Sequence, residues 1–211
     1  MEADHVLSTT RSVRKRMDLQ RPVSREVILE CLQIALQAPT GGNRQGWQFV
    51  VVTDPVKKQR IGAWYRESWD QYTASGRLEY PETDPRHAQL PRVVSSSVYL
   101  AEHMGEVPAM VIPCHRGRVD GPNASNQEIA GLYGSILPAA WSFMLAARAR
   151  GLGGAWTTLH LRYEREVAEL LGIPHERYTQ AALITLGYFT GADFKPAERI
   201  ALDQIVHWDT W

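Results

Sequence analysis

The chain has 211 residues, of which 44% are hydrophobic and 22% charged, as is usual for a globular protein with a sizeable core. Lysine plus arginine and aspartate plus glutamate each number 23, so no overall field would attract nucleic acid or an anionic membrane. The acidic start lacks the pattern of a signal peptide and no apolar run looks long enough to span a bilayer, so we expect a cytoplasmic protein. The two cysteines, Cys31 and Cys114, are too few for a disulfide framework and are interpreted as reduced core thiols.

The first chemically suggestive stretch is basic and runs from Arg11 to Arg16. Arginine presents forked donors that match a phosphate, and serine adds a hydroxyl, so Arg11, Ser12 and Arg14 could converge on one anion. A solvated helix end has the same composition, and these residues alone leave both interpretations open.

A capped helix is predicted after Ser24, because serine followed by Glu26 and an apolar series is typical of a helix N-terminus. This helix should end before Pro39. The loop from Thr40 to Trp47 is rich in glycine and polar amides and leads into a strand at residues 48–53. Amide side chains give directional donors and acceptors, which suggests a site, although a plain turn has the same composition.

Residues 57–72 have the spacing of a helix, whereas residues 73–91 show no periodicity. An irregular stretch of this length inside a compact domain is usually a lid or another functional loop, so we interpret residues 62–91 as an active-site lid insert. Its aromatic residues would anchor the lid or face a substrate; they are Trp64, Tyr65, Trp69 and Tyr72. Ordinary core packing of these rings is the alternative.

A helix at residues 93–103 and a buried strand at residues 107–114 are predicted next. Because proline cannot donate to a ladder, Pro108 and Pro113 should lie at the ends of this strand or place it at a sheet edge. Cys114 is followed by a histidine, but no second Cys/His cluster stands at ligand spacing. We therefore predict no metal site.

The segment that dominates the chain is a long helix predicted over residues 126–150. Apolar side chains cover it nearly all round, so it must be buried in a core or against a partner chain. Pro138 removes a backbone hydrogen bond and should produce a kink or two abutting helices. Arg148 and Arg150 lie in the last turn, where cations favour the helix dipole, and Gly151 is a natural C-cap.

The glycine-rich sequence Gly151-Leu152-Gly153-Gly154 follows a helix and opens a strand. A dinucleotide-binding fingerprint has the opposite order, so the Rossmann interpretation fails. Beyond it we predict a short strand near residues 155–159, a helix over 163–171 and a strand over 179–188. The apolar C-terminal segment, residues 194–211, should be a docking tail that lies on its own domain or on a partner.

Four motifs, in this order, resemble the FMN-dependent nitroreductase family with its flavin-reductase, iodotyrosine dehalogenase and flavin-fragmenting relatives. They are Arg11-Ser12-Val13-Arg14, Ala38-Pro39-Thr40-Gly41-Gly42-Asn43-Arg44-Gln45-Gly46-Trp47, Gly151-Leu152-Gly153-Gly154-Ala155-Trp156 and Lys195-Pro196-Ala197-Glu198-Arg199. Each motif alone is weak, but together they cover nearly the whole chain. The resemblance implies one domain over residues 1–211 with an α+β fold: a three-layer α/β/α sandwich, a mostly antiparallel sheet and a long central helix at a homodimer interface.

The resemblance also implies an FMN site between the two subunits and NADH or NADPH as the electron donor. The flavin phosphate would be held by Arg11, Ser12 and Arg199, with Lys195 beside them. Arg14 would lie near the pyrimidine edge of the ring, where positive charge stabilises the reduced flavin anion. Residues Pro39, Thr40, Gly41 and Asn43 would approach from the other subunit. The ring near N5 and O4 would meet Gly153, Gly154, Thr157 and Thr158.

Two positions depart from the usual family pattern. Gly46 stands where the family usually has proline, and Thr157-Thr158 is more similar to the dehalogenase and flavin-fragmenting branch. The expected function is an oxidoreductase that passes electrons from NAD(P)H through FMN to a small electron-poor acceptor, such as a nitroaromatic or a quinone. The flavin would carry the chemistry, so no side chain is assigned as acid or base. Reductive dehalogenation, flavin fragmentation and flavin binding without turnover are the alternatives.

Overall fold

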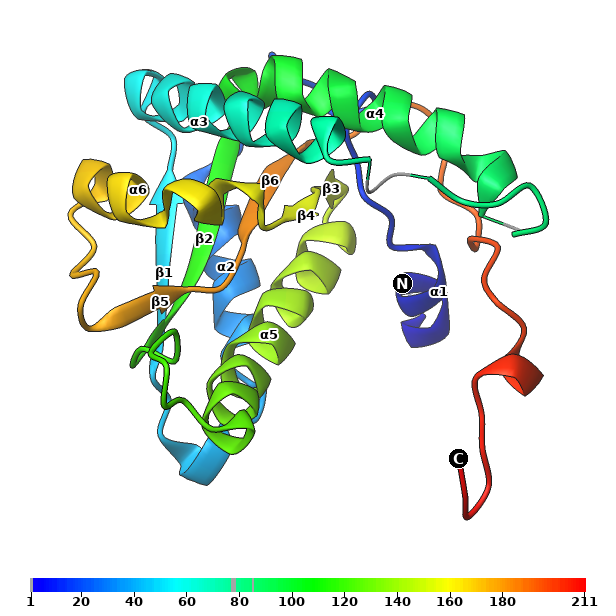
Figure 1. The fold of residues 1–211 in the computed structure, drawn as a ribbon. Helices are drawn as coiled ribbons and strands as arrows, with labels where there is room; N and C mark the ends of the chain where they lie inside the picture. The colour runs from blue at the N-terminus through cyan, green and yellow to red at the C-terminus, as the bar shows by residue number, and fades with distance from the viewer. Residues whose placement is uncertain (1, 77–78, 85) are drawn as a thin grey trace.

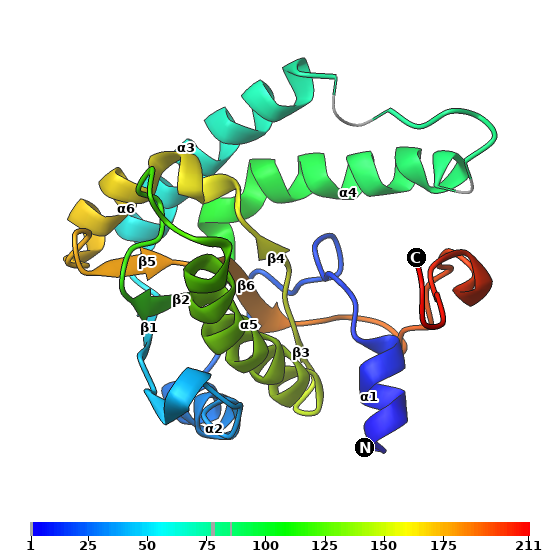
Figure 2. The same ribbon diagram turned by 60° about the horizontal axis from the view of Figure 1, so that its bottom comes forward.

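The computed structural model describes residues 2–76, 79–84 and 86–211. An antiparallel sheet lies between two layers of helices, as Figures 1 and 2 show. The helices are α1 (Ala3–Thr9), α2 (Arg25–Ala35), α3 (Pro55–Ala74), α4 (Leu90–His103), α5 (Asn126–Arg148) and α6 (Glu164–Leu171). The strands are β1 (Trp47–Val52), β2 (Ala109–Arg116), β3 (Leu152–Gly153), β4 (Trp156–Thr157), β5 (Tyr178–Gln180) and β6 (Leu183–Tyr188).

The three-layer arrangement is visible along β2, because successive side chains of this strand belong to two separate hydrophobic cores. Ala109 and Val111 pack with residues of α2 and α5 on one face of the sheet. Met110 and Ile112 pack with residues of α3, α4 and α6 on the other face. Successive residues of a strand point to opposite faces, so one fully apolar strand serves both cores. The predicted α+β sandwich is confirmed.

The sheet runs in the order β1-β2-β6-β3, with β4 paired to β6 and β5 paired to β2, and each of these ladders is antiparallel. Of the two predicted alternatives the sheet edge is wrong, because β2 pairs on both of its sides; Pro108 directly precedes the strand, as the other alternative predicts, whereas Pro113 lies within it. The carbonyl of Pro113 accepts from the N–H of Ala181 at 2.9 Å. The nitrogen of Pro113 therefore faces the junction between β5 and β6, where a ladder donor is not needed. The same junction divides the predicted strand over residues 179–188 in two.

The long central helix α5 begins with a capping box. Ser125 Oγ accepts from the N–H of Glu128 at 3.2 Å, and the Glu128 carboxylate accepts from the N–H of Ser125 at 2.9 Å. The helix continues through Pro138 to Arg148, so the prediction of two abutting helices is wrong. By length and composition alone α5 could cross a membrane, contrary to our expectation from the sequence. Its packing against α2 and the sheet accounts for the same apolar composition.

One stripe of α5 faces away from its own chain. The exposed positions on it are Gln127, Ala130, Gly131, Gly134 and Trp141, which recur at helical spacing. Trp141 is 40% exposed. The helix is thus only partly buried within one chain. The core of the same chain covers one side of it, and the stripe on the other side is exposed.

The C-terminal tail projects beyond α1, away from the sheet (Figures 1 and 2). Its apolar side chains remain exposed, with Leu202 at 73% and Trp208 at 84%. Docking of residues 194–211 on their own domain is therefore not what the structure shows. The cysteine prediction is confirmed, since Cys31 and Cys114 are both buried and free.

Candidate functional site

The residues after α1 converge with α3 and β4 around one partly buried arginine. Arg14 donates from Nη1 to Ser96 Oγ of α4 at 3.3 Å, and its Nε is buried without a hydrogen-bond partner among the described residues. Burial lowers the pKa of Arg14, an effect that Tyr65 opposes. A buried N–H without an acceptor is costly, so this arginine is suited to a ligand that brings an acceptor.

Tyr65 and Thr157 complete this cluster. The hydroxyl of Thr157 lies 3.4 Å from the hydroxyl of Tyr65. Burial raises the pKa of Tyr65, while the Thr157 hydroxyl and the charge of Arg14 oppose that shift. The tyrosine is therefore a neutral hydroxyl at physiological pH. Thr158, the next residue, is exposed at the start of a short 3-10 helix.

The glycines of the third motif permit the N-terminal segment to lie against β3. A Cβ at Gly153 would stand 2.4 Å from a methyl carbon of Val13, and a Cβ at Gly154 would stand 2.0 Å from the carbonyl oxygen of Thr185. The N–H of Val13 donates to the carbonyl of Gly154 at 2.9 Å. Ser12 forms an isolated bridge with Gly154. Sequence reasoning assigned these glycines to a ligand; their first physical role is to seat the segment that carries Ser12 and Arg14.

The predicted anion-binding residues at the two ends of the chain lie together. Arg11 donates from Nε to the carbonyl of Lys195 at 3.2 Å. The pKa of Arg11 is lowered first by burial and second by the nearby charge of Arg199. Two guanidinium groups close enough to repel each other are stabilised by an anion between them. The structure thus brings Arg11 onto the backbone of Lys195 and within range of the charge of Arg199, although these residues are far apart in sequence.

The loop of the second motif lies elsewhere in the same chain. The N–H of Gly41 donates to Ser135 Oγ at 3.0 Å, and Trp47 Nε1 donates to the carbonyl of Ser135 at 2.8 Å. At 1.5 Å per residue, Ser135 lies about 20 Å along α5 from Arg148, beyond which Gly153 follows. Within one chain the predicted loop residues therefore do not meet the arginine cluster; they are Pro39, Thr40, Gly41 and Asn43.

Gly46, which departs from the family pattern, is accounted for by a close contact. A Cβ at this position would stand 2.8 Å from the buried ring of His115. Asn43 and Gln45, which precede it in the loop, have positive φ angles of 53° and 49°, and Gln45 Nε2 donates to Asn43 Oδ1 at 3.0 Å. The loop is thus held by its own amides, and those amides are partly engaged with each other.

The predicted lid insert divides into two parts. Residues 62–74 belong to α3, where Tyr65 and Trp69 are only 3% and 7% exposed and pack in the core. Trp64 stacks on Tyr163 with ring centroids 6.1 Å apart, and the ring of Tyr72 lies 6.1 Å from that of Trp69. Core packing thus explains two of the four aromatic residues. Residues 77–78 and 85 of the insert lie outside the described residues.

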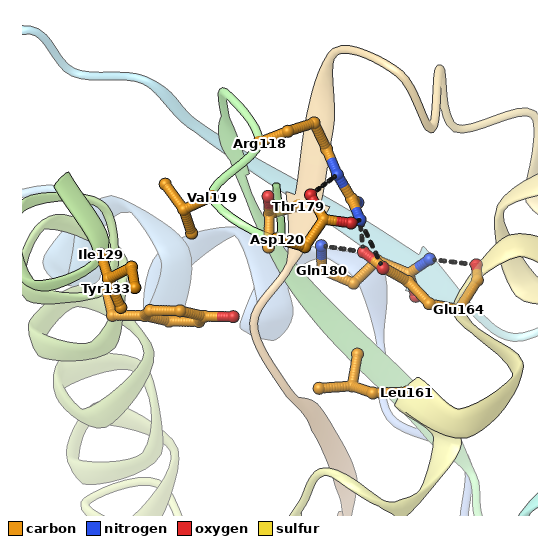
Figure 3. A pocket seen from close by; sticks show the side chains of 9 residues that line it. All are labelled: Arg118, Val119, Asp120, Ile129, Tyr133, Leu161, Glu164, Thr179 and Gln180. Carbon is orange, nitrogen blue, oxygen red and sulfur yellow. Dashed lines mark hydrogen bonds and ion pairs between the residues drawn. The ribbon is translucent and has the colours of Figure 1, made fainter. Parts of the chain in front are cut away.

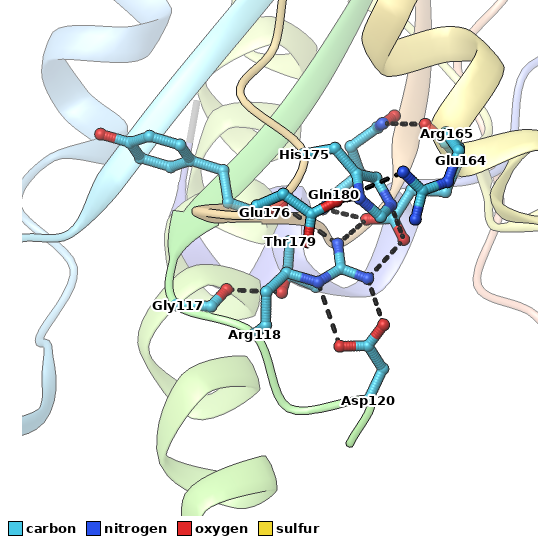
Figure 4. A network of polar contacts seen from close by, with 10 residues as sticks. Gly117, Arg118, Asp120, Glu164, Arg165, His175, Glu176, Thr179 and Gln180 are labelled. Carbon is cyan, nitrogen blue, oxygen red and sulfur yellow. Dashed lines mark hydrogen bonds and ion pairs between the residues drawn. The ribbon is translucent and has the colours of Figure 1, made fainter.

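A cavity of about 320 Å³ lies apart from every predicted site residue. Figure 3 shows Ile129 and Tyr133 of α5 on one side and a polar wall on the other. The polar wall is a closed network, drawn in Figure 4. Arg118 donates to both oxygens of Glu164, at 2.7 and 3.0 Å, and to Asp120, and the N–H of Gln180 donates to Glu164 at 2.9 Å. These charges satisfy one another and tie the segment after β2 to α6. Across the described ranges, no group of acidic, histidine or cysteine side chains could hold a metal ion.

The three-layer fold is similar to that of solved flavoproteins. A BluB-like flavoprotein from Clostridium difficile 630 is similar with a TM-score of 0.72 and 18% identity, over 100% of each chain. An iodotyrosine deiodinase, solved with FMN and 3-iodo-L-tyrosine, is similar with a TM-score of 0.71 and 21% identity, over 98% of each chain. At these identities the similarity concerns the fold.

The family itself is defined by sequence. The profile of the Nitroreductase family matches residues 7–188, and the chain therefore belongs to that family. The Bacillus subtilis protein YdgI, provisionally named an NAD(P)H nitroreductase, is 25% identical over 213 residues, which cover 96% of this chain and 95% of YdgI.

Proposed function

We propose that this protein is an FMN-dependent oxidoreductase that passes electrons from NADH or NADPH to a small electron-poor acceptor, such as a nitroaromatic or a quinone. The observation that carries the proposal is the convergence of Arg11, Arg199 and the Lys195 backbone beside Ser12, in a chain of the nitroreductase family. In the described part of the chain Arg11 and Arg199 donate to backbone carbonyls and to no carboxylate, and an arginine pair of this kind suits a phosphate. Lys195 and Arg199 come from the last of the four motifs, which lies beyond the region matched by the family profile.

The residues present fit FMN on two grounds. The phosphate would lie among Arg11, Ser12 and Arg199, and the ring would extend toward Arg14, whose buried Nε has a free N–H. The carbonyl groups of the pyrimidine edge supply the acceptor that this N–H needs.

A second copy of the chain would complete the site. The loop of Pro39, Thr40, Gly41 and Asn43 lies near the middle of α5, about 20 Å from the end where the arginines gather. If two α5 helices pack antiparallel through their exposed stripes, the loop of one chain approaches Gly153 of the other. The small residues of the stripe allow close approach, and Trp141 would be covered. We therefore propose a homodimer with two sites, each built by both chains.

Bound FMN would supply the two-electron chemistry, and the chain would supply position and charge. Arg14 would place a cation at the pyrimidine edge, which favours the reduced anionic ring. In the structure the Thr157 hydroxyl donates to the Tyr65 hydroxyl at 3.4 Å; to donate to the ring it would turn, and the Tyr65 hydroxyl would then donate to Thr157. Residues 79–84 and 86–89 of the insert, beyond α3, would limit access of water to the ring. No side chain of the cluster is needed as a general acid or base.

The proposal is tested by removing and restoring the cofactor. Apoprotein should show no oxidation of NADH or NADPH in the presence of a quinone such as menadione, and added FMN should restore it. Because donor and acceptor would use the same face in turn, initial rates at several acceptor concentrations should give parallel double-reciprocal lines. Turnover that is independent of FMN would refute the proposal.

A second candidate is favoured by the position of Thr157. A hydroxyl that donates to the ring near N5 alters the balance between one- and two-electron chemistry, and Thr157 lies within the cluster that contains Arg14. The alternative functions are reductive dehalogenation or flavin fragmentation. Stepwise anaerobic reduction followed by absorption distinguishes them, since direct passage from oxidised to fully reduced flavin favours the oxidoreductase. Tight FMN that neither nicotinamide reduces would indicate a binding protein without turnover.

A further inference from the structure

The root of the C-terminal tail is held by an ion pair between a buried arginine and an exposed carboxylate, which sequence patterns do not reveal. Arg148, the last residue of α5, is only 3% exposed and pairs with the carboxylate of Asp193. The same carboxylate accepts from the N–H of Phe194 at 2.8 Å and lies 2.6 Å from His5 Nε2 of α1. These contacts lower the pKa of Asp193 to about 2, with the Phe194 N–H as the largest cause, followed by Arg148 and His5. One carboxylate thus joins α1, α5 and the tail.

A second arginine holds the other side of the same turn. Arg16 donates from Nε to the carbonyl of Thr190 at 2.7 Å and from Nη2 to the carbonyl of Ala192. Its guanidinium lies 4.2 Å from the centre of the Phe194 ring, and the guanidinium of Arg148 lies 5.0 Å from that centre. Phe194 is thus bordered by two cations, which attract the ring face. In the turn before the tail, the carbonyls of Thr190 and Ala192, the carboxylate of Asp193 and the ring of Phe194 thus all contact an arginine.

This turn directly precedes the residues assigned to the flavin phosphate. Lys195 follows Phe194, its carbonyl accepts from Arg11, and Arg199 comes four residues later. Beyond this point the tail is largely exposed. The direction in which the chain leaves Asp193 therefore sets where Arg199 stands relative to Arg11.

We propose that Asp193 and Arg148 are positioning residues for the phosphate half of the flavin site, and that neither touches the cofactor. The inference rests on the proposed function, because it assumes that Arg11 and Arg199 bind the FMN phosphate. Loss of the pair frees the turn, and the phosphate loses a correctly placed arginine. The isoalloxazine ring, held by Arg14 and the β3–β4 segment, keeps its contacts.

Comparison of FMN with riboflavin, which has the same ring and no phosphate, isolates this effect. Apoprotein is titrated with each flavin, and binding is followed by quenching of flavin fluorescence. Asp193→Asn should raise the dissociation constant of FMN about tenfold, the loss of one charge-assisted contact, and that of riboflavin by less than about twofold. Asp193→Glu keeps the charge and should restore part of the FMN affinity. Glu176→Gln, which breaks the exposed pair with Arg165, is the matched control and should change neither constant.

If Asp193→Asn does not fold because Arg148 is left as an unpaired buried charge, the double variant Arg148→Met/Asp193→Asn removes both charges and carries the test. The double variant should fold and show the same selective loss of FMN affinity. Unchanged FMN affinity, or an equal loss of FMN and riboflavin affinity, would overturn the inference while the proposed function stands. A wild-type protein that binds neither flavin would overturn both.

Discussion

The proposed dimer face makes a sharp prediction at Gly134, which lies in the exposed stripe of α5. A Cβ built on Gly134 meets nothing within 4 Å in the described chain. Glycine in a helix interior costs about 1 kcal/mol relative to alanine, and glutamate is nearly as good a helix former as alanine. For an isolated chain, Gly134→Glu should therefore stabilise the fold by somewhat less than about 1 kcal/mol.

In the proposed dimer, Gly134→Glu should be destabilising instead of stabilising. If the stripe is buried against a second α5, Gly134→Glu places a carboxylate from each chain into a tightly packed, apolar contact. An unpaired buried charge costs several kcal/mol, so the dimer should weaken by more than about 100-fold. Because the proposed site needs both chains, FMN affinity should fall with it.

The assay is sedimentation equilibrium combined with urea unfolding over a range of protein concentrations, since the stability of an obligate dimer depends on concentration. Val56→Glu, on the 75% exposed side chain in the first turn of α3, is the control and should leave the assembly unchanged. A Gly134→Glu protein that remains dimeric, or a wild-type protein that is monomeric at micromolar concentration, would refute the reasoning.

Three further predictions concern the fold and the arginine site. Gly154→Ala should destabilise the fold by about 3 kcal/mol or more in urea, because its Cβ would stand 2.0 Å from the carbonyl oxygen of Thr185, whereas Gly121→Ala, with open space around it, should have little effect. His160 is fully buried, and burial lowers its pKa from 6.5 to about 3, so the unfolded chain binds a proton that the folded chain does not. The contribution of His160 to the free energy of unfolding is present above pH 6.5 and should fall by up to about 1.4 kcal/mol per pH unit below that value. His160→Leu should reduce this slope in urea titrations across pH 4–7, and an unchanged slope would contradict the assignment. Arg199→Ala should weaken FMN about tenfold in an equilibrium titration, and unchanged affinity would count against the phosphate role.

The sequence was sufficient to predict the helices whose ends and faces depend on neighbouring residues. Ser24 accepts from the N–H of Val27 at 3.4 Å at the start of α2, as its N-cap pattern indicates. The apolar run after Ser125 forms α5 close to its predicted length. Pro113 was misplaced because its effect depends on where the neighbouring strands part, at Ala181, and that junction is a property of the sheet rather than of the strand.

The candidate site also has features that the sequence predicts and contacts that only the tertiary structure shows. The basic character of the segment at Arg11 and the spacing of the four motifs are visible in the sequence, and they located the elements that meet. Arg148 was interpreted as a cation at a helix end, whereas it is buried and pairs with the exposed carboxylate of Asp193, 45 residues further along the chain. Tyr65 and Trp69 have the i, i+4 spacing of any core-facing helix. The sequence therefore could not distinguish a lid role from the burial of both rings, or show that Tyr65 lies beside Thr157. Contacts between distant segments need the tertiary structure.

The most direct test of the central claim is an absorption spectrum of the purified, concentrated protein, followed by anaerobic addition of NADH or NADPH. The account predicts the bands of a bound flavin, which persist after gel filtration and bleach with one of the two nicotinamides. A colourless protein that takes up no added FMN would contradict it.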